Sequence, residues 1–406
     1  MIKKDETAVC KNPHEYEGKT IMVEGELQHV PMFSKWRYIC KCCGGRCNLV
    51  YFPAIKRYFC NQWECNLRYP VPVVFFLCVS YAMSVVAMVE FMYNAEKIAM
   101  LILTSISFFF WIVSYFCACC RSPGYLPFYW AVEKKEVFTF EQQMDGVCTN
   151  DEQKEFACYN GRPERGSFSQ QAHRLVLKAD HICKWIANWV GLKNYRYFYL
   201  KVLWSIIYFL CWFIDFILVF VRIGQNGWKT KVGNIGMLIC VLPMLGFFVF
   251  IFIIFRRHTR YTIHNTTTLQ QFRLKKNPDK HNYYDLGCWN NCVQVFGPEK
   301  CCICWFFPVP IKREWGGFRW KTNRPIPKDD DESDGNQPLA NEDHVNLVES
   351  AHDSEKPAGS SNSSVFIENS EIEKEKEKQR DLKIEASDNS GIQSQEDENH
   401  NTESDY

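Results

Sequence analysis

The 406-residue chain has a formal net charge of +1, but this near-neutrality hides a basic body and an acidic tail. Residues 328–406 contain 23 acidic and 7 basic side chains, which leaves residues 1–327 with a net charge of +17. The tail is rich in Ser, Asn, Glu and Lys, a composition that excludes a packed core, so residues 328–406 are predicted to be disordered.

In chain order, an N-terminal segment, residues 1–70, precedes four long apolar stretches. Each approaches or exceeds the ~20 residues that a helix needs to cross a hydrocarbon core of ~30 Å. The stretches are Val71–Phe91, Ile98–Cys120, Leu200–Val221 and Val232–Phe255. Four buried helices of a soluble domain are the alternative, but such long helices rarely lack a polar face. The predicted fold is an all-α multi-pass membrane protein, with two helices in residues 71–120 and two in residues 200–255.

Basic residues are distributed unequally around these stretches. The connection after Phe91 holds only Lys97, and the connection before Val232 holds three basic residues. The other flanks hold more: Lys56, Arg57, Arg68, Arg121, Lys134, Lys135, Lys193, Arg196, Arg256, Arg257 and Arg260. This excess places both termini and the loop of residues 121–199 in the cytosol, together with residues 256–327. Neither a disulfide framework nor a nucleic-acid partner is expected.

The loop contains three residues that could perform nucleophilic chemistry: Asp180, His181 and Cys183. A thiolate is a good nucleophile, and His181 could act as the general base that takes its proton. Asp180 could orient the imidazole and stabilise its charged form. Taken alone, an Asp-His-x-Cys string is more often a chance occurrence with an inert cysteine. Its position adds weight, because Cys183 lies 17 residues before the third apolar stretch, near the expected membrane surface.

Several motifs around these residues resemble the cysteine-rich domain of the DHHC-type protein S-acyltransferases, also called palmitoyltransferases. Within the loop, whose matching core is residues 155–198, they are Arg162-Pro163-x-Arg165, Asp180-His181-x-Cys183, Trp185-Ile186-x-Asn188, Val190-Gly191 and Asn194-x-x-x-Phe198. Elsewhere they are Ser122-Pro123-Gly124, Thr267-Thr268-Leu269-Gln270 and Tyr284-Asp285-Leu286-Gly287 with Asn291. Several motifs in the family's order are much more specific than any one of them.

The resemblance departs from the family at its metal positions. Ile182 replaces the second His of the signature, which is a zinc ligand in the family. Six further positions that hold Cys or His in a typical member are altered, at Glu155, Phe168, Ser169, Ala172, Leu175 and Trp189. Only Cys158 keeps its ligand type, and one thiolate cannot hold a four-coordinate zinc. We therefore expect no metal site and neither of the family's two zincs, with the altered positions forming a small packed core instead.

The resemblance implies transfer of a fatty acyl group from palmitoyl-CoA to cysteines of cytosol-facing target proteins, with no prosthetic group. Cys183 would carry the acyl group, His181 would be the base and Asp180 would orient it. Arg162, Arg165 and Arg174 are candidates for binding the phosphates of the acyl-CoA. The protein would reside in an endomembrane (Golgi or endoplasmic reticulum) or in the plasma membrane. A catalytically inactive scaffold or adaptor is the alternative, and a small transporter is disfavoured by the few intramembrane charges.

Overall fold

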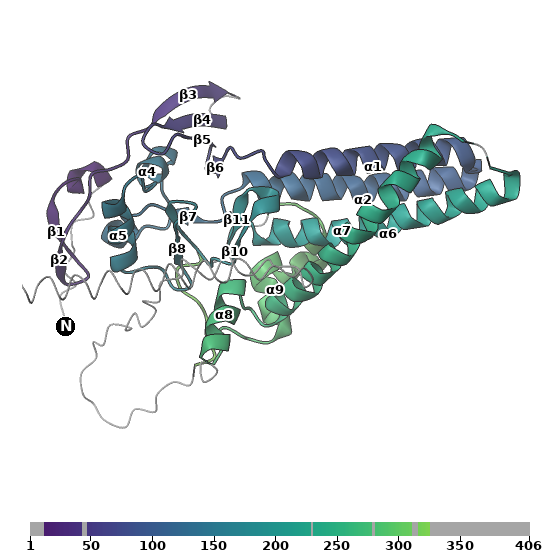
Figure 1. Ribbon diagram of the computed structural model, residues 1–406. Helices are drawn as coiled ribbons and strands as arrows, with labels where there is room; N and C mark the ends of the chain where they lie inside the picture. Colours follow the sequence, from purple (N-terminus) through teal and green to yellow (C-terminus); the bar gives the residue numbers. More distant parts are fainter. Residues whose placement is uncertain (1–11, 43–46, 229, 278–280, 311–315, 325–406) are drawn as a thin grey trace, which may run out of the picture. The chain divides into compact units, whose positions relative to one another are not determined.

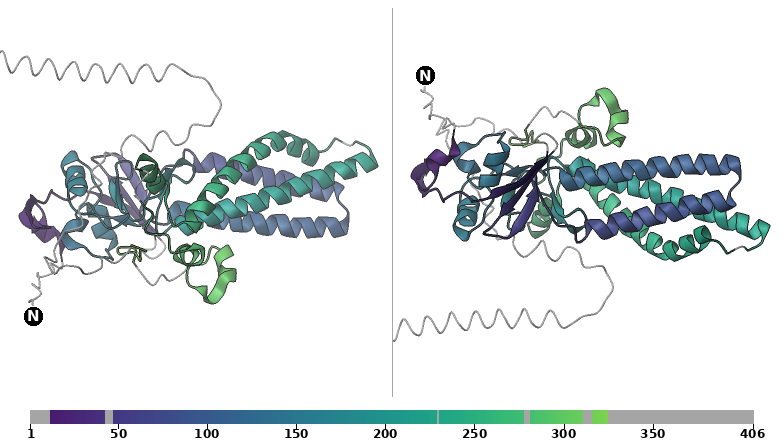
Figure 2. Two further views of the ribbon diagram at one scale, coloured as in Figure 1. Left: turned by 90° about the horizontal axis from the view of Figure 1, so that it is seen from below. Right: turned by 90° about the horizontal axis from the view of Figure 1, so that it is seen from above.

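The computed structural model describes residues 12–42, 47–228, 230–277, 281–310 and 316–324. The predicted acidic tail, residues 328–406, lies outside the described residues. Four long helices run side by side in the described part of the chain (Figures 1 and 2). They are α1 (Pro70–Phe91), α2 (Asn94–Cys120), α6 (Tyr195–Asn226) and α7 (Val232–Ile263). All four are long and apolar enough to cross a membrane, which confirms the predicted multi-pass membrane protein.

The helix bundle is held together mainly by apolar side chains, with a few polar contacts at its centre. The most extensive contacts join α2 to α6 and α1 to α7. Outward-facing side chains such as Ile239 and Leu242 are 70% and 75% exposed in the absence of lipid. Within the bundle, Asp215 of α6 accepts hydrogen bonds of 2.8 Å from Ser84 of α1 and from Thr104 of α2. Burying a carboxylate without hydrogen-bond partners costs free energy, and these two donors offset part of that cost. The same two bonds join α1, α2 and α6 at one point.

Outside the bundle, the described residues contain four small β-sheets that the sequence did not predict. A hairpin pairs β1 (Thr20–Val23) with β2 (Glu26–His29). The second sheet has the order β3 (Arg37–Cys42), β4 (Cys47–Phe52), β5 (Arg57–Cys60) and β6 (Trp63–Glu64). The third has the order β7 (Tyr125–Leu126), β9 (Arg174–Val176) and β8 (Ser167–Ser169), and the fourth pairs β10 (His181–Cys183) with β11 (Asn188–Val190). Strands of two to six residues are too short to give a periodic signal.

Short helices complete the part outside the membrane helices. Between α2 and α6 lie α3 (Trp130–Glu133), α4 (Phe140–Asp145), α5 (Asp151–Tyr159) and the 3₁₀ turn η3 (Lys184–Ile186). After α7 follow α8 (Thr268–Lys276), α9 (Cys288–Phe296) and η4 (Glu299–Phe306), and η1 (Pro13–Tyr16) lies near the N-terminus. Figure 1 shows β10, β11, α8 and α9 beyond the same end of the bundle, so segments separated by about a hundred residues meet there.

Candidate active site

The Asp180–Cys183 segment is fastened directly to the end of a membrane helix. In the β10–β11 hairpin, Cys183 lies opposite Asn188. The Nδ2 atom of Asn188 donates to the backbone oxygens of Cys119 and Arg121, at 2.8 and 3.0 Å. Carbonyls at a helix C-terminus lack partners within their own helix, so Asn188 caps α2 while it anchors the hairpin. The sequence motif that carries Asn188 therefore fixes the height of Cys183 above the bundle.

Asp180 and His181 form an orienting pair beside the thiol. The Oδ2 atom of Asp180 lies 2.6 Å from Nδ1 of His181, and Oδ1 accepts a hydrogen bond of 2.6 Å from the backbone N–H of Thr268. Asp180 is fully buried, whereas the side chain of His181 is 21% exposed. Side chains two residues apart on a strand point to the same face, so His181 and Cys183 share one face of β10. With Nδ1 committed to the carboxylate, Nε2 is left for the thiol.

Electrostatic interactions favour the charged forms of all three groups, although burial opposes each of them. Burial lowers the pKa of His181, but the hydrogen bond to Asp180 and the interaction with Cys183 raise it to about 10. Burial raises the pKa of Asp180, but its contacts with His181 bring it down to about 2. Burial also raises the pKa of Cys183, but His181, then Lys201, hold it below its ordinary value. These interactions shift the equilibrium toward a thiolate–imidazolium pair, compared with an isolated thiol and imidazole.

Two buried residues beside this pair were not among the predicted site residues. His258 of α7 is 4% exposed, and its Nδ1 lies 3.8 Å from Oδ2 of Asp180. Lys201 of α6 is 6% exposed, and its Nζ lies 5.4 Å from the ring centroid of Phe198. The same ring is 5.2 Å from that of His181, so Lys201 and His181 flank Phe198. A signal for both existed in the sequence, because ionisable residues at the ends of apolar stretches are functional candidates.

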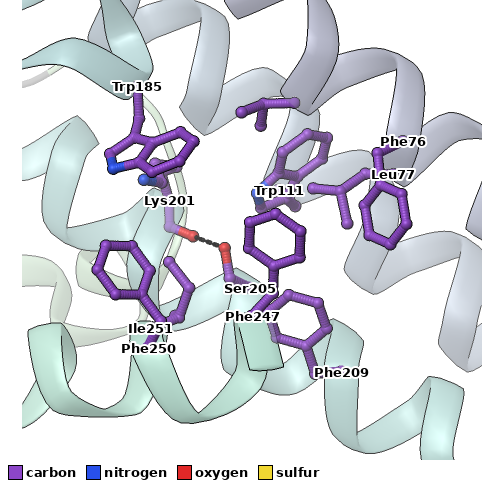
Figure 3. Close-up of a pocket in the computed structure, with 11 residues that line it drawn as sticks. Phe76, Leu77, Trp111, Trp185, Lys201, Ser205, Phe209, Phe247, Phe250 and Ile251 are labelled. Carbon is purple, nitrogen blue, oxygen red and sulfur yellow. Dashed lines mark hydrogen bonds between the residues drawn. The ribbon is translucent and has the colours of Figure 1, made fainter. Parts of the chain in front are cut away.

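An apolar cavity opens between the membrane helices next to the hairpin (Figure 3). It is lined by Val73, Phe76, Leu77, Trp111, Trp185, Lys201, Ser205, Phe209, Phe247, Phe250 and Ile251. Figure 3 shows Lys201 close to Trp185, which follows Cys183 by two residues. The cavity volume is about 40 Å³, well below the roughly 300–1,000 Å³ of typical ligand pockets. A long acyl chain could enter only if the lining aromatic side chains rotate.

The three arginines predicted to bind phosphates occupy different environments. Arg174 is 1% exposed, donates to the backbone oxygen of Gln62 at 2.9 Å and lies 3.7 Å from the ring centroid of Tyr125. Arg165 donates to Asn265 and Gln270 and lies between two aromatic rings. Both guanidinium groups are therefore structural, and their burial does not fit the predicted phosphate contacts. Arg162 is half-buried, and its proposed phosphate role stays a prediction.

The motifs distant in sequence converge on the same end of the bundle. Ser122, which stands where the family has Asp, accepts hydrogen bonds of 3.2 Å from the backbone N–H groups of Gly124 and Tyr125, so it still closes a turn. Gln270, which replaces the family's Glu, accepts a hydrogen bond of 2.7 Å from Arg165. Both substitutions thus keep an oxygen acceptor at the position where the motif needs one.

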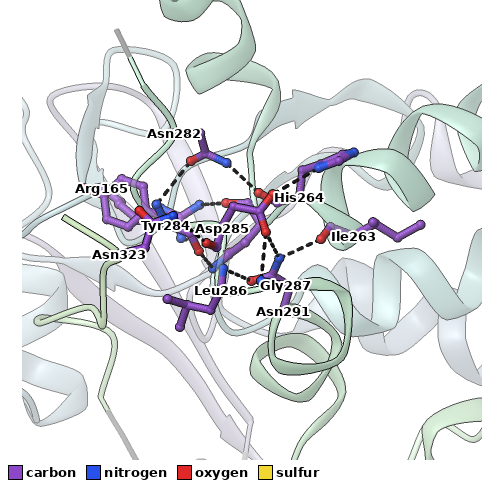
Figure 4. Close-up of polar contacts among 11 residues, drawn as sticks. Arg165, Ile263, His264, Asn282, Tyr284, Asp285, Leu286, Gly287, Asn291 and Asn323 are labelled. Atoms are coloured by element: carbon purple, nitrogen blue, oxygen red, sulfur yellow. Dashed lines mark hydrogen bonds and ion pairs between the residues drawn. The ribbon is translucent and has the colours of Figure 1, made fainter. Parts of the chain in front are cut away.

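The C-terminal motif forms a polar network beneath the end of α7 (Figure 4). The side-chain amide of Asn291 donates to the backbone oxygen of Ile263 and to Oδ1 of Asp285, each at 2.6 Å. Its oxygen accepts from the backbone N–H of Leu286 at 3.0 Å. Asn291 is fully buried, so a change here would leave several buried polar groups without partners. This network holds the α7–α8 turn that presents Thr268 to Asp180.

The altered metal positions have packed against one another. Phe168 lies opposite Leu175 in the β8–β9 pair, and Ile182 lies opposite Trp189 in the β10–β11 pair. Leu175 is 1% exposed and belongs to an apolar cluster with Leu126, Trp130, Leu177 and Leu192. Cross-strand apolar pairs stabilise a sheet without any metal. Since Phe, Leu, Ile and Trp supply no donor atom for zinc, this set of residues does not fit the family's tetrahedral sites.

The N-terminal β-sheet braces the catalytic loop from a direction that the sequence did not indicate. The indole N–H of Trp63, at the β5–β6 turn, donates to the backbone oxygen of Ala187 at 3.0 Å. Arg57 donates to the backbone oxygen of Gln171 at 3.2 Å and pairs with Glu64. Together with the Arg174–Gln62 contact, these bonds hold the loop at several points outside the hairpin.

Comparison with known proteins identifies relatives of this arrangement. Residues 149–275 match the family model of the DHHC palmitoyltransferase. Over 155 residues the chain is 30% identical to palmitoyltransferase ZDHHC2 of Mus musculus and 29% identical to ZDHHC20 of Homo sapiens, covering 37% of this chain and 42% of each relative. It is 31% identical over 161 residues to ZDHHC15 of Xenopus laevis, covering 37% of this chain and 45% of that relative. The aligned segment thus spans less than half the length of these relatives.

Proposed function

Because residues 149–275 match the DHHC palmitoyltransferase family model and are similar to curated palmitoyltransferases, we propose that the chain is a membrane-embedded protein S-acyltransferase of this family. The observation that carries the proposal is the placement of Cys183 on the same strand face as His181, which Asp180 orients at 2.6 Å. The apolar cavity beside the hairpin would take up a fatty chain once its lining aromatic side chains rotate. Palmitoyl-CoA is the proposed donor, and cysteines of membrane-associated proteins are the proposed acceptors.

The proposed first step is acylation of Cys183. The thiolate attacks the thioester carbon of the acyl-CoA, so a new S–C bond forms and the carbonyl electron pair moves to oxygen. The intermediate collapses, the CoA thiolate leaves, and the proton held on His181 neutralises it. Exchange of one thioester for another is close to energy-neutral, so correct positioning supplies most of the rate acceleration.

The proposed second step transfers the acyl group to a protein. A cysteine of the target attacks the Cys183 thioester, and His181 takes the proton of the incoming thiol. Asp180 stabilises the resulting imidazolium, as it does in the free enzyme. Cys183 returns to its thiolate form, which restores the starting arrangement.

Lys201 has a proposed part in both steps. It lies inside the cavity wall, and its charge contributes to the lowered pKa of Cys183. No carboxylate within the described residues pairs with it. An ammonium group at the mouth of a dry cavity would stabilise both the thiolate and the negative oxygen that forms on the thioester. Burying the amine of Lys201 in place of an apolar side chain costs free energy, and a role in the reaction would explain why it is there.

The proposed orientation places the catalytic loop in the cytosol, where acyl-CoA is available. The excess of basic residues on that side of the apolar helices supports it. Structural zinc is not part of the proposal, because the positions that would hold it form apolar cross-strand pairs. The choice between Golgi, endoplasmic reticulum and plasma membrane follows from the family and has no support from a particular residue.

The proposal is tested by labelling the full-length protein with an alkyne analogue of palmitoyl-CoA. We expect one label that neutral hydroxylamine releases and that is lost in Cys183→Ala. The matched control is Cys158→Ala, an exposed cysteine of the same loop, which should keep the label. Absence of a hydroxylamine-sensitive label on Cys183, with a relative labelled in parallel, would favour the scaffold alternative and reject the proposal.

A further inference from the structure

A second cavity lies where α7 leaves the apolar bundle, and no step of the proposed reaction uses it. Its volume is about 440 Å³, within the range of ligand-binding pockets. Arg256, Arg257 and Arg260 of α7 line it, and Lys275 of α8 completes the wall. Phe252 and Ile253, one turn below the arginines, are 43% and 52% exposed. The cavity therefore joins a lipid-facing apolar surface to a cluster of four cations.

The four cations have no acidic partners in the described part of the chain. Among those residues no carboxylate lies within ion-pair distance of any of them. His264, which also lines the cavity, contacts Asp285 at 3.1 Å. Positive charges held this close repel one another unless an anion lies among them. A ligand with several negative charges would remove that repulsion.

One residue of the cavity wall also carries a buried hydroxyl group without a partner. Thr266 lines the wall and is 3% exposed, and its Oγ1 makes no hydrogen bond within the described residues. Its backbone N–H is satisfied by the oxygen of Tyr261 at 2.9 Å, so only the side chain is unpaired. A buried donor of this kind is expected to have a partner, and a phosphate oxygen would provide one.

The cavity and the catalytic centre lie on different faces of α7. Residues 252, 256 and 260 are spaced by four and form one stripe of the helix. Ile251, His258 and Thr262 form the buried stripe, and His258 faces Asp180. The cation cluster is thus turned toward the surrounding lipid rather than toward Cys183.

We propose that this cavity binds the phosphorylated headgroup of an anionic membrane phospholipid. Its apolar rim at Phe252 and Ile253 would contact the lipid chains, while the four cations and Thr266 contact the phosphates. Basic pockets at the membrane surface are suited to such headgroups. Phosphates of an acyl-CoA share this chemistry, but the outward direction of the cavity favours a lipid that stays in the bilayer.

The test is native mass spectrometry of the detergent-solubilised full-length protein with added phosphatidylinositol 4-phosphate, with phosphatidylcholine as the neutral comparison. We expect one molecule of the anionic lipid to bind in preference to the neutral one. The double variant Arg256→Gln/Lys275→Gln should bind it about 10- to 30-fold more weakly, since each surface cation contributes to lipid affinity. The matched control Arg68→Gln/Lys276→Gln also removes one Arg and one Lys, outside the cavity, and should bind within about twofold of the unmodified protein.

Two further arms keep the result decisive. Thr266→Val changes no charge and should weaken binding several-fold while the thermal midpoint of the protein is unchanged. Equal weakening in the double variant and its control would show unspecific attraction and overturn the proposal. Palmitoyl-CoA that displaces the lipid from the unmodified protein would assign the cavity to the donor phosphates and overturn the lipid assignment. None of these measurements depends on acyl transfer, so they stand apart from the test at Cys183.

Discussion

The β10–β11 hairpin and the neighbouring β7–β9–β8 sheet differ in the chemical character of their side chains. The candidate catalytic residues at the hairpin are polar, whereas the paired residues of the sheet at former metal positions are apolar. At the β10–β11 hairpin, Asp180 lies within hydrogen-bonding distance of His181, and Cys183 follows His181 by two residues on the same strand. In the adjacent sheet, Phe168 and Leu175 stand where a typical relative has metal ligands, and they pack against each other. A reaction requires particular donor and acceptor atoms at fixed positions. A sheet that only stabilises the loop does not need such atoms, because apolar packing can provide the stability.

Among the changes that leave Cys183 in place, the largest loss of activity is expected from changing the orienting carboxylate. Asp180→Asn should lower the rate of Cys183 acylation by about 10²- to 10⁴-fold, the usual contribution of acid–base catalysis. It should also change the pH dependence. In the unmodified protein the pKa of Cys183 is lowered and that of His181 is raised to about 10, so the rate should fall less steeply from pH 8 to pH 6 than for an ordinary thiol. Without Asp180 the imidazolium is lost near neutral pH, and the rate should then vary more steeply with pH in that interval.

Initial rates of acylation across this interval check the prediction. The rate of the unmodified protein should fall by clearly less than tenfold per pH unit. A decline of about tenfold per pH unit below 8, as for an ordinary thiol of pKa ~8.5, would contradict the ion pair.

The packed sheet is tested by a change that should affect stability rather than chemistry. Leu175→Ala removes a side chain that is 1% exposed, and should cost about 2–5 kcal/mol of unfolding free energy. Thermal unfolding in detergent measures the loss, with Leu27→Ala as the control because Leu27 is 70% exposed. If the two variants melt alike, the altered positions do not form a supporting core.

Two substitutions of Lys201 should show whether its charge or its packing affects the rate of acylation. Lys201→Met keeps the length of the side chain but removes its charge, and should slow acylation by about 10²-fold, as for loss of one oxyanion donor. Lys201→Arg keeps the charge and should restore part of the rate. A neighbouring control, Ser205→Ala, lies on the same cavity wall and should change the rate little. Equal rates for Lys201→Met and the unmodified protein would remove Lys201 from the mechanism.

A smaller effect is expected from the brace between the N-terminal sheet and the catalytic loop. Trp63→Phe removes the 3.0 Å hydrogen bond to the backbone oxygen of Ala187 and should destabilise the protein by about 1 kcal/mol. Trp228→Phe is the control, since that indole is 59% exposed. Their thermal midpoints, measured side by side, show whether the sheet supports the loop.

The smallest effect is expected from Cys158→Ser, which changes the one family zinc position that still holds a cysteine. Because Phe168, Leu175 and Trp189 offer no ligand atom, the zinc content of the purified protein should be the same in Cys158→Ser as in the unmodified chain. Acylation should likewise be unchanged after that substitution. A fall in zinc content in Cys158→Ser would show that Cys158 still holds a metal and would contradict the apolar replacement.

The sequence revealed the parts of this molecule whose signal is continuous or specific. Four apolar stretches predicted α1, α2, α6 and α7, because a run of about twenty apolar residues matches the thickness of a bilayer and is rare in soluble domains. The order Asp180-His181-x-Cys183 predicted a site that the structure brings together. The strands were missed because they are very short and depend on partners far along the chain, as β7 depends on β9.

The predicted roles of the arginines show where sequence reasoning stops. A basic residue beside a cysteine motif suggests phosphate binding. The sequence around Arg174 does not indicate that Gln62 and Tyr125, both distant along the chain, contact its guanidinium group. Burial is a property of the whole fold, and the structure encloses Arg165 and Arg174 among protein partners. His258 became part of the site for the same reason, since only the packing of α7 against the hairpin brings it to Asp180.

The contacts of Trp320 have a consequence for the order of events during synthesis. Its ring lies 4.3 Å from the guanidinium of Arg165 and 5.1 Å from Nζ of Lys178, although the hairpin that follows those residues ends at Val190. The ribosome must therefore add more than a hundred further residues, including two membrane helices, before the loop gains this aromatic neighbour. Chains released early would carry Asp180, His181 and Cys183 in incomplete surroundings, so premature termination is expected to yield protein that the cell degrades rather than a smaller working enzyme.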